Sequence, residues 1–438
     1  MEIFVVLSIA LLIGLLLSRL AKLVKLPAVT AYLIAGILVG PYLLGALNIT
    51  GLGFHSMADV KSYSILSDAA LGFIAFSIGN EFRLSQLKKT GKQATVIGIF
   101  QAVVATLVVD AALIGIHFLI PDKLPLPSAI ILGAIASATA PAATLMVVKQ
   151  YKAKGPLTDI LLPIVALDDA VGLILFAVSF GISKALISGA IDILSVIVEP
   201  LLEVVLSLLL GAVMGFLFNF SEKFFHSRSK RLSVSVAFVC LTVGLSMLKF
   251  EVFGVHIAFS SLLTCMMLGT IFCNICDFSE ELMERTDRWA APLFVLFFVI
   301  SGAELELSVF TDIAIVGIGL VYIITRSGGK YFGSLASAKA TKCDSNIVKY
   351  LGITLLPQAG VSLGMAMKAQ TLGAEGAVVA NITLFAVLIY EVVGPLLTKI
   401  SLQKAGEIKP DEKVSARDAA RKILAEKSRK EHLKKKSV

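Results

Sequence analysis

The stretch that decides the fold is Val165-Ala166-Leu167-Asp168-Asp169-Ala170-Val171-Gly172. Two adjacent carboxylates lie in the middle of an apolar segment, residues 157–183, which exceeds the roughly 20 residues that a helix needs to cross a bilayer. A carboxylate at that depth costs about 3 kcal/mol, so it persists only where it is paired, protonated or hydrated. Neighbouring side chains point about 100° apart on a helix, so the two acids face different partners. The stretch therefore predicts a polar site inside a membrane-spanning bundle.

The composition supports a membrane protein along the whole chain. Of 438 residues, 57% are hydrophobic and 16% are charged, whereas soluble domains carry about 25% charged residues. The first apolar stretch lacks a basic leading region and a cleavage site, which predicts a span instead of a removed signal. Cys273 and Cys276 form a lone C-x-x-C without a second pair or a histidine cluster, so no metal centre or cofactor is expected there.

Apolar segments predict an all-α integral membrane protein with about thirteen transmembrane helices. The predicted spans are residues 2–18, 28–47, 63–80, 94–120, 128–148, 157–183, 193–219, 232–248, 254–273, 289–303, 311–338, 350–370 and 378–399. Lys and Arg gather in every second connector, which places the N-terminus outside and the C-terminus in the cytoplasm. The basic segment 401–438 is predicted to be a solvated cytoplasmic tail. The net charge of +8 thus reflects topology, and no nucleic-acid partner is expected.

A repeated motif ends the third and the tenth predicted spans. The two copies are Gly79-Asn80-Glu81-Phe82-Arg83-Leu84 and Gly302-Ala303-Glu304-Leu305-Glu306-Leu307. Spans seven apart run in opposite directions, so the copies predict inverted repeats, as in many secondary transporters. The repeats would cover residues 1–183 and 232–400 of a transmembrane domain 1–400, with 193–219 as a linker helix. Glu81 and Glu304 are the corresponding acids.

Two predicted spans are interrupted at matching places in the two halves. The fifth contains Ser137-Ala138-Thr139-Ala140-Pro141 and the twelfth contains Leu356-Pro357-Gln358-Ala359-Gly360. Unwound backbone within a membrane is tolerated where it is buried in protein or lines a cavity. Matching interruptions in inverted halves are the best pointer in a sequence to a transport site. The expected breaks lie at Ala140 and Pro141 in the fifth span and at Pro357 and Gln358 in the twelfth.

Two basic residues of the eleventh predicted span are candidate partners for buried acids. Asp168 and Lys330 lie roughly 16 and 12 Å from the cytoplasmic face at 1.5 Å per residue, so they can meet. Arg326, one helical turn from Lys330, and Glu391 form a second expected pair, interpreted as a fixed salt bridge between the repeats.

The Asp pair predicts a binding site for a hard monovalent cation. Burial and a nearby cation act oppositely on a carboxyl group's affinity for protons. Asp169 can therefore exchange a proton for Na⁺ or K⁺ bound at Asp168 and Asp169, while Asp168 pairs with Lys330 when no cation is bound. Hydroxyls of Ser137 and Thr139 would complete the oxygen shell.

Together these residues resemble the monovalent cation:proton antiporter superfamily, in the branch of sodium/proton antiporters with an Asp-Asp motif and glutathione-gated potassium/proton systems. The resemblance covers nearly all of residues 1–408. Its marks are Leu26-Pro27-Ala28-Val29, Ala35-Gly36-Ile37-Leu38-Val39-Gly40-Pro41, the two G-x-E segments, Leu167-Asp168-Asp169, Gly329-Lys330, Val393-Gly394-Pro395 and Ala405-Gly406-Glu407.

The resemblance implies a sodium/proton antiporter fold with crossed discontinuous helices, elevator-type movement, a homodimer and residence in the inner (plasma) membrane. By motif position, Asp169 matches the ion-carrying acid, and Asp168 with Lys330 matches the salt-bridged pair of electrogenic members. Two departures bear on selectivity. Ala140 stands where many relatives have Asp, which removes one candidate ligand, and Asp168 stands where potassium systems tend to have Gln, which favours sodium.

The expected function is exchange of a monovalent cation (Na⁺, with K⁺ or Li⁺ as alternatives) for protons, and no enzymatic activity is expected. A channel is disfavoured because the sequence shows no selectivity-filter loop. An intramembrane aspartyl protease is disfavoured because its two acids must converge. A sodium-coupled small-solute symporter and an ion-flux sensor remain alternatives on the same fold.

Overall fold

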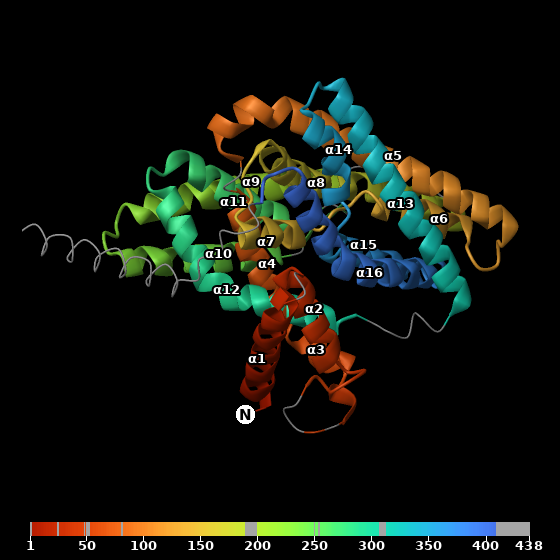
Figure 1. The fold of residues 1–438 in the computed structure, drawn as a ribbon, viewed down its shortest axis with the longest axis horizontal. Coiled ribbons are helices and arrows are strands. Elements are labelled where there is room, and N and C mark those ends of the chain that lie inside the picture. The colour runs from red at the N-terminus through yellow and green to blue at the C-terminus, as the bar shows by residue number, and fades with distance from the viewer. Residues whose placement is uncertain are drawn as a thin grey trace, which may run out of the picture.

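The computed structural model describes residues 2–23, 26–47, 49, 53–79, 82–188, 199–248, 250–252, 255–305 and 312–408. Helices dominate these residues and form two bundles, seen side by side in Figure 1. The scaffold bundle consists of α1 (Glu2–Leu23), α2 (Ala28–Val39), α4 (Ser64–Gly79), α9 (Glu199–Glu222), α10 (Arg228–Ser246), α11 (Ser261–Ile275) and α12 (Ser279–Ala303). A 3₁₀ turn, Gly45–Leu47, and α3 (Met57–Ser62) connect α2 to α4.

The second bundle carries the Asp pair and is named the site bundle. It consists of α5 (Leu84–Leu119), α6 (Leu126–Ile135), α7 (Pro141–Tyr151), α8 (Pro156–Ser188), α13 (Ile313–Ala340), α14 (Ser345–Thr354), α15 (Gly360–Ala369) and α16 (Ala374–Lys404), with a 3₁₀ turn at Gln370–Leu372. Helix α5 packs lengthwise on α13 and also contacts α8. Helices α7 and α16 bring this bundle against α2 and α4 of the scaffold bundle, and α8 also meets α9.

The glycine that opens each copy of the repeated motif lies at a helix crossing in the scaffold bundle. A Cβ on Gly302 of α12 would overlap the backbone of Leu33 in α2, and a Cβ on Gly79 of α4 would overlap the carbonyl of Met266 in α11. Small residues allow helices in membranes to approach closely. Close packing is therefore one reason why both motifs begin with Gly. Glu304 follows α12 and is partly buried, whereas Glu81 lies outside the described residues.

The predicted helical class is confirmed, with one addition. Residues Phe250–Val252 (β1) and Val255–Ile257 (β2) form a short antiparallel hairpin before α11. Each predicted span coincides with one helix or with a pair of helices on either side of a break. Among the described helices, eight are long and apolar enough to cross a membrane singly. The number of crossings, about thirteen, stays a prediction.

Several predicted boundaries are corrected by the structure. The fourth span, predicted as 94–120, begins at Leu84. The ninth span, predicted as 254–273, becomes helical at Ser261 because β-branched residues before it adopt the hairpin. The tenth, predicted as 289–303, begins at Ser279, since a charged amphipathic turn extends the apolar helix. The linker helix, predicted as 193–219, is described from Glu199 to Glu222, and residues 189–198 lie outside the described part. Residues 401–404 of the predicted tail belong to α16. Residues 409–438 of the tail lie outside the described part of the chain.

Candidate ion-binding site

The two predicted helix breaks lie against each other in the middle of the site bundle. Residues 136–140 separate α6 from α7, and residues 355–359 separate α14 from α15. The backbone N–H of Ala140 donates a hydrogen bond to the carbonyl of Pro357 at 2.8 Å. Pro141 is the first residue of α7, where a helix needs no N–H donor. The breaks thus satisfy part of their backbone hydrogen bonding through each other.

Asp168 of α8 is surrounded by hydrogen-bond donors from other elements. Lys330 Nζ lies 2.9 Å from Asp168 Oδ2, and both side chains are fully buried. The Thr139 hydroxyl donates to the same oxygen at 2.7 Å and accepts from Lys330 Nζ at 2.9 Å. Lys330 also donates to the backbone carbonyl of Ser137. The structure therefore brings together Asp168, Lys330, Thr139 and the backbone of Ser137.

Gln101 of α5 is a further partner of Asp168 that the sequence analysis missed. Its side-chain amide donates to Asp168 Oδ1 and, at 2.9 Å, to the carbonyl of Gly98. The residue is completely buried. A glutamine in the middle of an apolar span is a signal in the sequence, because uncompensated polar groups are costly at that depth. With Gln101, both oxygens of Asp168 are held by donors.

Asp169 has the opposite surroundings. It is 1% exposed, and within the described part of the chain neither of its carboxylate oxygens has a hydrogen-bond partner. A buried polar group without a partner is rare in proteins and calls for an explanation such as a bound ion or water. An unpaired carboxyl group at membrane depth persists when it is protonated, hydrated or bound to a cation. Asp169 is thus the member of the pair that no donor of the described structure engages.

The role of the Ser137 hydroxyl as a cation ligand stays a prediction, because the hydrogen bond it donates leaves its oxygen lone pairs available. This hydroxyl donates back to the carbonyl of Ala134 at 2.7 Å, while the carbonyl of Ser137 accepts from Lys330. Gln358 is also engaged, donating to the carbonyl of Ile135 at 3.1 Å and to the Tyr322 hydroxyl at 2.8 Å. These bonds connect the two breaks to α6 and α13.

The structure does not bring Arg326 and Glu391 together. The buried guanidinium of Arg326 donates to the carbonyls of Ala136 at 3.0 Å, Ala138 at 2.6 Å and Leu356 at 2.8 Å. A helix ends with carbonyls that have no partner within the helix, and the planar fork of an arginine can bind several of them. The expected salt bridge is therefore wrong for this structure, because Arg326 binds the ends of the broken helices. Glu391 of α16 is 5% exposed, and its Oε2 has no hydrogen-bond partner in the described structure.

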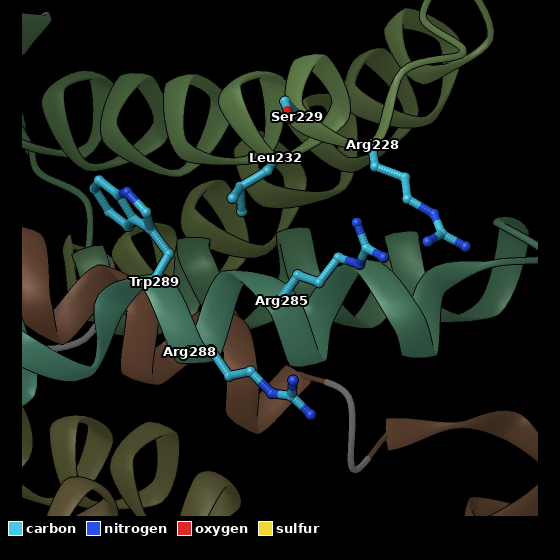
Figure 2. A pocket seen from close by; sticks show the side chains of 6 residues that line it. All are labelled: Arg228, Ser229, Leu232, Arg285, Arg288 and Trp289. Carbon is cyan, nitrogen blue, oxygen red and sulfur yellow. The ribbon is translucent and has the colours of Figure 1, made fainter.

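A surface hollow of about 340 Å³ lies away from these residues, between α10 and α12 of the scaffold bundle. Figure 2 shows the residues that line it: Arg228, Ser229, Leu232, Arg285, Arg288 and Trp289. Both arginines of α12 form ion pairs with a glutamate one turn earlier in the same helix. Arg285 pairs with Glu281 at 2.7 Å, and Arg288 pairs with Glu284 at 2.5 Å. Because these charges are compensated and the hollow is remote from α8, it is not part of the candidate ion site.

Crossed broken helices around a buried Asp–Lys pair define a class of ion-transporting membrane proteins. The chain belongs to the sodium/hydrogen exchanger family, whose transmembrane model matches residues 7–404. The sequence resemblance to the monovalent cation:proton antiporter superfamily is thereby confirmed.

Two relatives extend along most of the chain. The chain is 25% identical over 417 residues to the Na(+)/H(+) antiporter NhaS4 of Synechocystis sp., covering 91% of this chain and 96% of the relative. It is 24% identical over 399 residues to the K(+)/H(+) antiporter subunit KhtU of Bacillus subtilis, covering 88% and 90%.

Solved structures show the same fold. The sodium proton antiporter MjNhaP1 of Methanocaldococcus jannaschii, seen by electron microscopy, superposes with a TM-score of 0.71 at 16% identity, covering 92% of this chain and 98% of that one. A structure of the same antiporter at pH 8 gives 0.61 at 19% identity, with coverages of 93% and 97%. The predicted sodium/proton antiporter fold is confirmed.

Proposed function

We propose that this protein exchanges a monovalent cation for protons across the membrane, with Asp169 as the group that carries either ion. The supporting observation is the contrast within the Asp pair. Asp168 is held by Lys330, Thr139 and Gln101, whereas both oxygens of Asp169 lack a partner in the described structure. Family membership and relatives named as Na⁺/H⁺ and K⁺/H⁺ antiporters support the same activity.

The exchange rests on competition for carboxylate oxygens. A proton or a hard cation binds Asp169, and each excludes the other. A cation that also approaches Asp168 weakens the attraction between Asp168 and Lys330, and a buried lysine that loses its counter-charge releases its proton readily. The three groups titrate as a coupled set, so the protons belong to the group and not to one residue.

Alternating access would come from movement of the site bundle against the scaffold bundle. Polar contacts at the end of α7 currently hold the two bundles together: Lys149 pairs with Asp287 of α12, and the Gln150 side chain accepts from the N–H of Ala28 at 2.8 Å. These contacts must break if the bundles move as an elevator. In the predicted inverted repeats, α2 corresponds to α11 and α4 corresponds to α12. A contact between α2 and α12 should then be matched by one between α11 and α4. Both contacts are present, which supports the predicted repeats.

The remaining properties follow from the resemblance. Asp168 favours Na⁺, and the likeness to KhtU keeps K⁺ as a candidate. A homodimer in the plasma membrane, with the N-terminus outside and the C-terminus in the cytoplasm, is part of the proposal.

The test is cation-driven proton movement in energised proteoliposomes. Adding Na⁺, K⁺ or Li⁺ should release protons for at least one cation, and Asp169→Asn should abolish the response. The matched control is Asp122→Asn, which alters an exposed acid in the loop before α6 and should leave the response intact. Absence of proton release with all three cations, or full activity in Asp169→Asn, would refute the proposal.

A further inference from the structure

Gln101 lies on a helix that the Asp pair and the two breaks do not otherwise involve. Helix α5 carries it against α8, where its amide reaches Oδ1 of Asp168. The other oxygen of that carboxylate already accepts from Lys330 and from Thr139. The two oxygens of Asp168 therefore accept hydrogen bonds from different donors. Oδ2 accepts from Lys330 and Thr139, and Oδ1 accepts from Gln101.

The position of Gln101 is determined by tight packing. A Cβ on Gly333 of α13 would lie 3.0 Å from Gln101 Cα, so the glycine permits α13 to approach α5 here. The amide of Gln101 also donates to the carbonyl of Gly98 at 2.9 Å, which leaves little freedom for rotation. An ionised carboxylate only accepts hydrogen bonds, so the amide nitrogen and not the amide oxygen faces Asp168.

This arrangement has a consequence for a cation that is to be ligated by Asp168. Oδ2 already accepts from the ammonium of Lys330 and the hydroxyl of Thr139, so a cation that ligates Asp168 approaches Oδ1, the oxygen that accepts from the Gln101 amide. The Gln101 bond to this charged acceptor is stronger than a bond between neutral groups, and its N–H directs partial positive charge at the oxygen that the cation would bind. The amide of Gln101 thus competes with the cation.

We propose that Gln101 is a positioning residue that holds Asp168 in its Lys330-paired arrangement and thereby weakens cation binding. The inference rests on the proposed cation/proton exchange. Its direct consequence is that removing the amide donor tightens the apparent affinity for the transported cation, because the negative charge of Oδ1 is then no longer shared with the Gln101 N–H.

The experiment measures the cation concentration for half-maximal proton release (KM) and the maximal rate in proteoliposomes. Gln101→Met keeps the length of the side chain and removes the donor. KM is expected to fall about tenfold, the order set by one hydrogen bond to a charged group, while the maximal rate does not rise. Gln101→Asn withdraws the amide from Oδ1 and should lower KM by a smaller factor. The Asn variant also gives a second measurement of KM if the Met variant fails to fold.

The matched control is Gln93→Met on the same helix. Gln93 donates to the carbonyl of Thr341 at 3.0 Å, at the far end of α13 from the Asp pair, so its loss should leave KM unchanged. A folded Gln101→Met or Gln101→Asn protein with unchanged or raised KM would overturn the inference while wild-type exchange stands. A wild-type protein without any cation-dependent proton release would overturn the proposed function and this inference together.

Discussion

The two adjacent aspartates are expected to differ sharply in what they contribute to stability. In Asp168→Asn the ammonium of Lys330 stays fully buried and keeps two neutral acceptors, the Thr139 hydroxyl and the Ser137 carbonyl. Removing one partner of a buried ion pair costs about 3–5 kcal/mol. In Asp169→Asn no hydrogen bond of the described structure is lost, because neither oxygen has a partner. A buried ionisable group is exchanged for a neutral amide of nearly the same shape, so the loss of stability should be much smaller than for Asp168→Asn, or absent.

The assay is thermal unfolding of the purified protein in detergent, in a buffer with a large organic cation in place of Na⁺ and K⁺. The midpoint should fall clearly for Asp168→Asn and stay near the wild-type value for Asp169→Asn, even though the latter abolishes exchange. Because unfolding of membrane proteins is often irreversible, the midpoints are compared at one scan rate. Equal losses of stability in the two variants would contradict the assignment of Asp168 as the held acid and Asp169 as the open one.

Two further predictions concern the breaks and the contact between the bundles. Arg326→Lys retains the charge but cannot reproduce three bonds to the carbonyls of Ala136, Ala138 and Leu356, so it should lose about 2 kcal/mol or more of stability, seen as a lower unfolding midpoint. An unchanged midpoint would show that these bonds do not hold the crossing. Lys149→Gln removes the ion pair with Asp287. If opening this contact limits exchange, the maximal rate should rise, by up to about fivefold for a partly exposed pair worth about 1 kcal/mol, with KM unchanged. A fall in the rate at normal folding would argue against that role.

Much of the candidate site follows from depth along each helix. The positions of Asp168 and Lys330 relative to the cytoplasmic face predicted that they could meet, and the structure places them 2.9 Å apart. The same argument from depth predicted a salt bridge between Arg326 and Glu391, which the structure does not show. Equal depth is necessary for a contact, but the rotation of each helix about its axis decides which side chains face each other. The guanidinium binds carbonyls released at the ends of α6 and α14 and forms no ion pair with Glu391 in the described structure.

The sequence by itself determined the membrane class, the places of the two breaks and the acids at the centre, because apolar length, proline position and isolated charges are properties of single segments. Only the tertiary structure decided that Gln101 holds Asp168, that Arg326 binds backbone carbonyls, and that Asp169, unlike Asp168, has no hydrogen-bond partner among the described residues. These features depend on how neighbouring helices are rotated and how closely glycines such as Gly333 let them approach. That information is distributed over segments far apart in the chain, so no local pattern contains it.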